Sequence, residues 1–288
     1  MRAVYLHEVD SAFTNLTAYV FSAFLLLFGG IYTMAYNINM RLANFEYVLQ
    51  SMSFLFIIII PVVTMRSLAE ERRQKTEQLL YALPLSMAQV VMGKYLALLT
   101  QFLLPVAVLG LYPLVLQGFG QVPMAAAFAS LTGFFFLGAA LLAMGLFISS
   151  VTESQSVAAG LCFVVMLLNY FLESLAQLVP GTAIASLAAF AVVIAALGFA
   201  VYRWTKNGVF AAVLTMLALA GNLLVYAFHS TAFEGLFASV IEKLSLFSRF
   251  YIFITGVFDW TAVVYDLTVI ALFLVLTVET MEKRRWSE

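Results

Sequence analysis

The chain has 288 residues, of which 64% are hydrophobic and 10% are charged, and its formal net charge is -1. Because soluble domains carry about 25% charged residues, this composition excludes a water-soluble globular protein and indicates an integral membrane protein. The balanced charge gives no basis for nucleic-acid binding, and a single cysteine, Cys162, excludes an internal disulfide and a thiolate metal site.

Residues 1–17 are expected to form a helix that lies along the inner membrane surface. Their apolar positions recur at helical spacing: Val4, Tyr5, Val9, Ala12, Phe13 and Leu16. Glu8 and Asp10 near the start argue against a secretory signal. A plain polar lead-in remains the alternative.

Eight stretches approach the length of about 20 apolar residues that a membrane-spanning helix needs. They lie at about 18–36, 51–67, 95–117, 125–149, 157–178, 183–202, 209–228 and 260–280. The fifth contains Asn169 and Glu173 and closes at Pro180-Gly181, so both a continuous helix and two short helices remain open. The sequence therefore predicts an all-α polytopic membrane protein with about eight spans.

The distribution of basic residues sets the expected orientation. With a cytoplasmic N-terminus, one side of the membrane collects eleven of the fourteen lysines and arginines, and only Arg41, Lys243 and Arg249 fall outside. An even number of spans then places both termini in the cytoplasm.

The segment 66–93, between the second and third spans, carries an unusual concentration of charge. Two ion pairs at i, i+4 spacing, Glu71 with Lys75 and Arg73 with Glu77, favour a helix. Pro84 then disfavours a helical conformation of the residue before it, and Ser86 with Gln89 forms a capping box that starts the next helix. This pattern predicts a cytoplasmic elbow, and a solvated loop helix is the plainer alternative.

Residues 231–256, before the last span, are expected to lie on the outer surface. Their first part, to about residue 246, predicts one amphipathic helix. Its apolar face comprises Phe233, Leu236, Phe237, Val240, Ile241 and Leu244.

The run AEERRQKTEQLLYALPLSMAQVVMGKYLALL resembles the cytoplasmic segment of ABC-2 type permeases, the membrane subunits of one class of ABC exporter. The matching positions are Glu70, Glu71, Arg72, Thr76, Leu79, Leu80, Pro84, Ser86, Gly93 and Lys94. Lys75 and Gln78 depart from the family pattern, which usually has Gly and Glu there. Both ends of the chain are similar to the gliding-motility-type branch, the C-terminal end through Asp259, Tyr265, Leu272, Phe273, Leu274, Thr277, Arg284, Arg285 and Trp286. Residues 180–230 then look like a hairpin added to a six-span plan.

The resemblance implies a coupling helix that contacts a separate ATPase. It assigns polar contacts to Glu70, Glu71, Arg72, Arg73 and Thr76, and packing contacts to Leu79, Leu80 and Leu83 before Pro84. The chain lacks a G-x-x-x-x-G-K-[ST] phosphate loop, so we expect that it binds no cofactor and is not an enzyme.

The resemblance also implies partners and a location. The expected partners are two copies of an ABC ATPase that bind ATP and Mg, a second permease copy or a paralogue, membrane lipids and an accessory membrane protein. The expected location is the bacterial plasma membrane.

Polar residues within spans suggest a transport pathway, and the candidates are Asn169, Glu173 and Asp266. Their expected position near the outer surface also fits simple solvation. Because no charged cage for an ion is evident, the sequence favours an amphipathic cargo, such as a lipid, a peptide or a polymer precursor.

Two other functions stay open. A non-transporting membrane anchor or sensor that recruits an ATPase would carry the same elbow. A secondary transporter would usually show two similar halves, and no convincing internal repeat is present. A membrane enzyme is disfavoured, because His7 and His229 are expected on opposite sides of the membrane.

Overall fold

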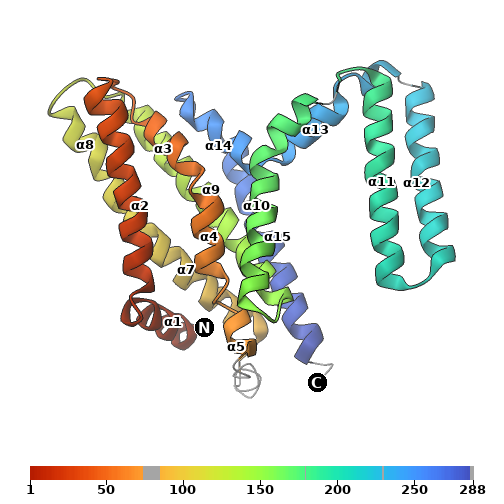
Figure 1. Ribbon diagram of the computed structural model, residues 1–288, viewed down its shortest axis with the longest axis horizontal. Coiled ribbons are helices and arrows are strands. Elements are labelled where there is room, and N and C mark those ends of the chain that lie inside the picture. Colours follow the sequence, from red (N-terminus) through yellow and green to blue (C-terminus); the bar gives the residue numbers. More distant parts are fainter. Residues whose placement is uncertain (74–84, 179, 229, 286–288) are drawn as a thin grey trace. The chain divides into compact units, whose positions relative to one another are not determined.

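The computed structural model describes residues 1–73, 85–178, 180–228 and 230–285. These residues form helices and no strand (Figure 1). Within these ranges, seven helices are long and apolar enough to cross a membrane, and eight spans result if one bent pair counts as a single span. The prediction of an all-α polytopic membrane protein is therefore confirmed.

The chain divides into two compact units. The first contains Met1–Tyr170 and Arg249–Glu288, and the second contains Phe171–Ser248. The long helix α10 (Gln155–Leu178) begins in the first unit and ends in the second. It is continuous, which resolves the question left open by the sequence for the fifth span.

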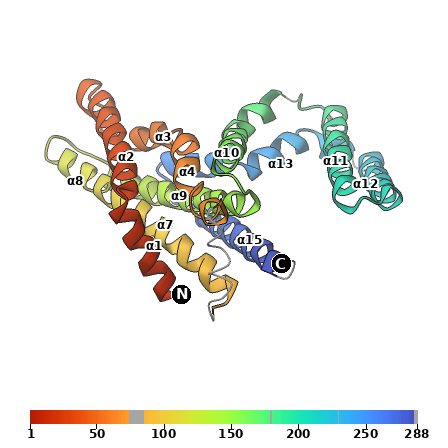
Figure 2. The ribbon, with the colours of Figure 1, turned by 60° about the horizontal axis from the view of Figure 1, so that its bottom comes forward.

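The first unit begins with α1 (Arg2–Thr14) and α2 (Thr17–Thr33). Leu16 joins them with a left-handed backbone, φ 60°. A π-helix, η1 (Met34–Asn39), extends α2 at its far end. Figure 2 shows α1 lying along the start of α7 (Met87–Leu109).

The second span differs from the continuous helix expected at 51–67. It consists of α3 (Glu46–Ser53) and a helical segment that begins with α4 (Phe56–Thr64), with a bend of 57° between them. The break falls at Phe54 and Leu55, where Leu55 N bonds to the carbonyl of Met52, three residues back, as in a tightened helix. Pro61 lies beyond the break, inside α4.

The short helix α5 (Ala69–Arg73) follows α4 and ends where the described residues stop. After the gap, Ser86 caps α7 by accepting a hydrogen bond from Gln89 N at 3.3 Å. The third span therefore starts at Met87, and α8 (Leu111–Gln117) completes it after Gly110.

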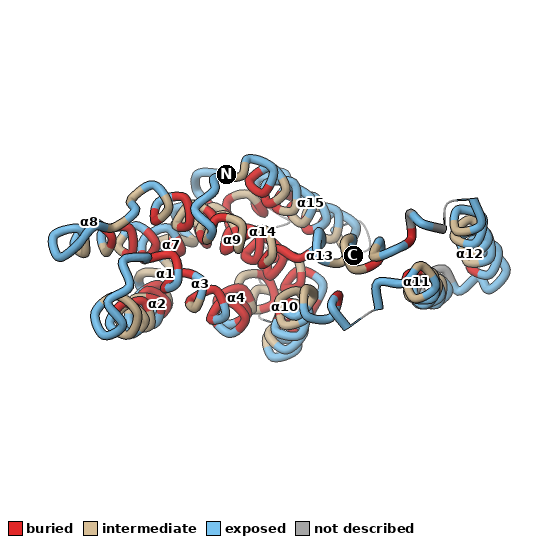
Figure 3. Tube along the Cα trace, turned by 90° about the horizontal axis from the view of Figure 1, so that it is seen from above, coloured by how far each residue is buried: buried red, intermediate tan, exposed pale blue. Residues whose placement is uncertain are grey.

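The centre of the first unit is α9 (Met124–Val151), the most buried of the candidate spans. Figure 3 shows buried residues gathered along it and along the helices around it. Gly138 of α9 packs directly against Phe102 of α7, and an added Cβ would lie 2.3 Å from the Phe102 ring. The last helix, α15 (Trp260–Arg285), packs along α9.

The second unit contains α11 (Ala183–Thr205) and α12 (Gly208–Phe228), which pack against each other as a helical hairpin. That this hairpin is an addition to a six-span plan stays a prediction. The left-handed backbone of Lys206 ends α11 and reverses the chain. Only 6% of the most apolar window of each helix is buried, as suits helices that face lipid.

The single amphipathic helix expected at about 231–246 is wrong. The segment contains the 3-10 turn η2 (Ser230–Phe233) and α13 (Leu236–Leu244), followed by α14 (Leu246–Ile254), which continues into the first unit. Gly235 takes φ +67°, which glycine adopts readily. Ser245 is extended, and its hydroxyl accepts a hydrogen bond from Ser248 N. These two residues interrupt the helix.

Candidate functional site

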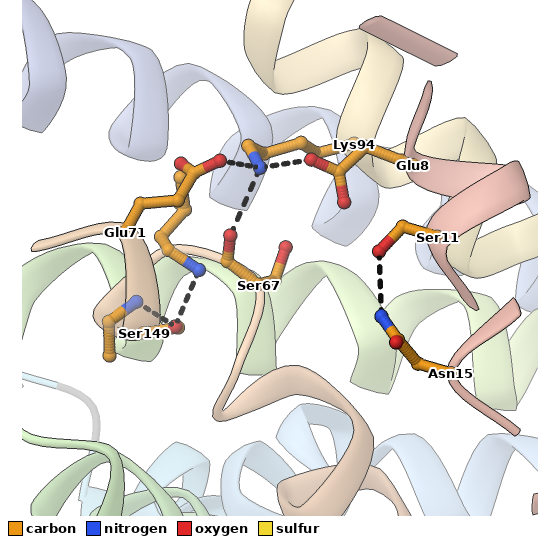
Figure 4. Close-up of polar contacts among 9 residues, drawn as sticks. Glu8, Ser11, Asn15, Ser67, Glu71, Lys94 and Ser149 are labelled. Carbon is orange, nitrogen blue, oxygen red and sulfur yellow. Dashed lines mark hydrogen bonds and ion pairs between the residues drawn. The ribbon is translucent and has the colours of Figure 1, made fainter. Parts of the chain in front are cut away.

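Lys94, in α7, is the centre of a polar cluster in the first unit (Figure 4). The cluster lies next to α5. Its Nζ donates to Glu8 Oε1 at 2.5 Å, to Glu71 Oε1 at 2.6 Å and to the backbone carbonyl of Ser67 at 3.1 Å. The Lys94 side chain is only 1% exposed, whereas those of Glu8 and Glu71 are 26% and 24% exposed. One buried ammonium therefore connects α1, α5 and α7.

The close packing of α1 on α7 places Glu8 within reach of Lys94. Gly93 leaves room for Val4, because a Cβ at position 93 would lie 3.1 Å from the Val4 side chain. The next residue of α1 is Tyr5, whose hydroxyl lies 3.1 Å from Thr100 Oγ1 of α7. The two helices are thus joined by packing and by hydrogen bonds on either side of Lys94.

The cluster is strongly coupled electrostatically. A buried ammonium is stable only when it is paired and hydrogen-bonded, and Lys94 has three acceptors for its three N–H donors. Removing one partner of a buried pair is strongly destabilising. We therefore expect α1, α5 and α7 to move together rather than separately.

A second set of contacts ties α5 to the end of α9. Ser149 Oγ accepts hydrogen bonds from the backbone N–H groups of Leu68 and Ala69, at 3.2 and 3.1 Å (Figure 4). Arg72 Nη1 donates to the Thr152 carbonyl at 2.9 Å. The neighbouring Val151 carbonyl accepts from Arg284 of α15 at 3.0 Å, so the same region of α9 also contacts the last helix.

The predicted coupling residues have different surroundings. Glu71 and Arg72 contact other helices of this chain, as described above. Glu70 is partly exposed and lines a polar cavity of about 450 Å³ together with Glu8 and Arg66. Arg73 is exposed. The remaining predicted residues lie outside the described part of the chain: Thr76, Leu79, Leu80, Leu83 and Pro84.

Sequence reasoning gave no role to Lys94, Glu8 or Ser149. Lys94 enters the sequence prediction only as part of a motif, although a lysine among the apolar residues that follow the cap of a long helix already suggests a buried partner. Nothing local to Ser149 distinguishes it from other serines in α9, since its partners lie about 80 residues away.

The three pathway candidates also differ in their surroundings. Asp266, in α15, is 2% exposed, so the expectation of a solvated position is wrong for it. Its Oδ1 has no hydrogen-bond partner within the described residues. Asn169 is half-buried in the first unit, and Glu173 belongs to the second unit, where its Oε2 accepts from Ser248 at 3.1 Å. Within the described ranges, no group of three or more His, Cys, Asp or Glu residues could hold a metal ion.

The fold and the cluster define a multi-pass membrane protein with a charged segment bound to several of its helices. The model of the family described as ABC-2 family transporter protein matches residues 30–176, about half of the chain. The chain therefore belongs to the ABC-2 transporter family, whose members are permease components of ABC transporters and work with an ABC ATPase subunit. No curated protein sequence gives a match to it.

Proposed function

We propose that the chain is the permease subunit of an ATP-driven exporter, and that the segment 66–93 receives the mechanical input from the ATPase. The observation that carries this proposal is the Lys94 cluster, in which Glu71 of the segment and Glu8 of α1 share one buried ammonium. A force on α5 would act directly on α1 and α7.

The contacts of α5 with α9 supply a second route for the same force. Displacing α5 would pull on Ser149 through two backbone hydrogen bonds and on Thr152 through Arg72. Because α9 is the buried centre of the first unit, its movement would displace the helices that pack against it, α4, α7 and α15. Force from the ATPase could then reach the membrane-spanning helices without a large deformation of α5 itself.

The partners and cofactors follow from this role. Two ATPase copies would bind ATP and Mg, while this chain binds no nucleotide and catalyses no reaction. A second permease copy or a paralogue would complete the pathway in a bacterial plasma membrane, together with lipids and an accessory membrane protein. The C-terminal residues named above support an assignment to the gliding-motility-type branch.

We propose an amphipathic cargo, such as a lipid-like molecule, a peptide or a polymer precursor. Asn169, Glu173 and Asp266 remain candidates for its pathway. The burial of Asp266, with Oδ1 unpartnered in the described structure, supports a role for it that solvation does not explain.

The test is a mild-detergent purification of the full chain from its native host, followed by mass spectrometry and an ATPase assay of the eluate. We expect a phosphate-loop ATPase to copurify. Arg73→Glu is the informative variant, because Arg73 is exposed and its reversal changes the docking surface. It should reduce the recovered ATPase activity.

Lys206→Glu is the matched control, since Lys206 is also exposed and is expected on the same side of the membrane. It should leave the yield of ATPase unchanged. Failure of any ATPase to copurify with folded protein would refute the proposal. An ATPase that copurifies but drives no movement of an amphipathic probe in vesicles would support the anchor or sensor alternative.

A further inference from the structure

A cavity of about 750 Å³ lies at the end of α2 away from α1, between η1 and its following loop on one side and α8 on the other. In Figure 1 the ends of α2 and α8 that border it are adjacent. The volume falls within the range of about 300 to 1,000 Å³ that is usual for small-molecule sites. This cavity belongs to neither the Lys94 cluster nor the coupling segment.

The charge that lines the cavity is positive. Arg41 lines it, and none of the described residues that line it is acidic. Arg41 has a left-handed backbone, φ 57°. It follows the last residue of the first candidate span, Asn39, by two positions. A cation there lies at the level of the lipid headgroups, where phosphodiester groups gather.

Two buried polar atoms of residues that line the cavity have no hydrogen-bond partner in the described parts of the chain. Thr33 is 8% exposed, and its Oγ1 has no hydrogen-bond partner among the described residues. Rotation about χ1 exchanges this hydroxyl with the methyl group, and threonine populates more than one such rotamer in helices. A ligand anion in the cavity would supply the missing acceptor.

Asn37 offers the complementary group. Its Nδ2 donates to the carbonyls of Leu42 and Asn44, at 2.8 and 3.4 Å, which fixes the orientation of the amide. Its Oδ1 is buried and has no donor within the described part of the chain. A ligand with a hydroxyl next to its anion would satisfy Asn37 and Thr33 together.

The remaining walls of the cavity are apolar and reach the membrane. Ile38, Val115 and Phe119 line it and are 60%, 61% and 88% exposed. They would contact acyl chains next to the headgroup. The π-helix contributes Asn37 and Ile38 to the cavity, in keeping with the frequent occurrence of π-helical turns at functional sites.

We propose that this cavity binds a phospholipid whose headgroup combines a phosphodiester anion with a free hydroxyl. Arg41 and Thr33 would bind the phosphate, Asn37 would accept from the hydroxyl, and the apolar wall would bind the first part of an acyl chain. The proposal does not depend on the transport function, because binding is measured on the chain alone.

Native mass spectrometry of the purified full chain tests it, by titration with four probes: phosphatidylglycerol, phosphatidylmethanol, phosphatidylcholine and inorganic phosphate. Phosphatidylglycerol should bind most tightly, because phosphatidylmethanol has the anion without the hydroxyl. Arg41→Gln should weaken phosphatidylglycerol binding about fivefold. Thr33→Val should weaken it about tenfold, through loss of a hydrogen bond to a charged group. Lys243→Gln, which removes an exposed cation from α13, should have no effect.

Several outcomes would overturn the proposal. Equal binding of phosphatidylglycerol and phosphatidylcholine would remove the case for an anion. Displacement of phosphatidylglycerol by millimolar inorganic phosphate would indicate an anion site without a lipid. A Thr33→Val variant that is more stable but binds phosphatidylglycerol unchanged would show that the hydroxyl has no ligand. A two-copy complex that excludes phosphatidylglycerol would identify a second chain as the occupant.

Discussion

Lys94 and Glu8, 86 residues apart in the sequence, lie 2.5 Å apart between Nζ and Oε1. The same ammonium holds Glu71 at 2.6 Å, so the N-terminal helix and the charged segment after the second span share one buried cation. This arrangement explains how a short charged helix can be rigidly attached to a permease.

Lys94→Met should strongly destabilise the first unit, because it leaves two partly buried carboxylates without their cation. The expected loss is about 3 to 5 kcal/mol in the free energy of unfolding, as for other buried pairs that lose one partner. Thermal unfolding in detergent measures it. Adding Glu8→Gln and Glu71→Gln to the variant should restore much of the stability. A triple variant no better than Lys94→Met would contradict this explanation.

Ser149→Ala should loosen the start of α5, since the backbone N–H groups of Leu68 and Ala69 lose their acceptor. Two unsatisfied buried donors cost about 1 to 3 kcal/mol each. Hydrogen exchange should therefore become faster at these two amides. Ser150→Ala is the control, because among the described residues the Ser150 hydroxyl bonds within its own helix, to the Phe147 carbonyl. Unchanged exchange in the Ser149 variant would argue against this contact.

Gly138→Ala should destabilise the chain, because the added methyl would overlap the buried ring of Phe102. Overpacking of this kind costs about 1 to 3 kcal/mol. Gly30→Ala is the matched variant, since an added Cβ there meets nothing within 4 Å. It should be neutral or stabilising, because alanine favours a helix over glycine. Equal unfolding temperatures for the two variants would contradict the close packing of α7 and α9.

Asp259 should stabilise the start of α15 in a pH-dependent manner. Its Oδ1 accepts a hydrogen bond from Thr261 N at 2.7 Å, and the hydrogen bonds from Thr261 lower the pKa of the Asp259 carboxyl. A lowered pKa in the folded state means that the stabilisation is present at neutral pH and is lost as the pH falls through the folded value. The difference in unfolding temperature between the wild type and Asp259→Ala should shrink on acidification. A difference independent of pH would show that the charge has no part in it.

The fold class and the approximate number of spans could be predicted, because composition and the length of apolar runs determine both. The bend in the second span could not be predicted, because the break at Phe54 and Leu55 lies in a run of residues without Pro or Gly to mark it. Gly235 interrupts the segment 231–246, but the amphipathic pattern around it predicts one continuous helix.

The site could be predicted only in part. The motif predicts that Glu71 and Arg72 contact an ATPase, and this stays a prediction. Their contacts with Lys94 and Thr152 arise from tertiary packing, which the motif does not reveal. The burial of Asp266 likewise depends on the helices around α15. Such long-range contacts leave no local pattern of residues.

The most direct test of the account is a cross-link between the charged segment and the ATPase. Arg73→Cys allows a thiol-attached photo-cross-linker to be placed at an exposed position, and the native Cys162 is only 1% exposed, so it should not compete. We predict a product that contains both this chain and the ATPase from residue 73, and none from Lys243→Cys in α13. An ATPase that stays bound but cross-links from residue 243 and never from residue 73 would contradict the assignment of 66–93 as the coupling segment.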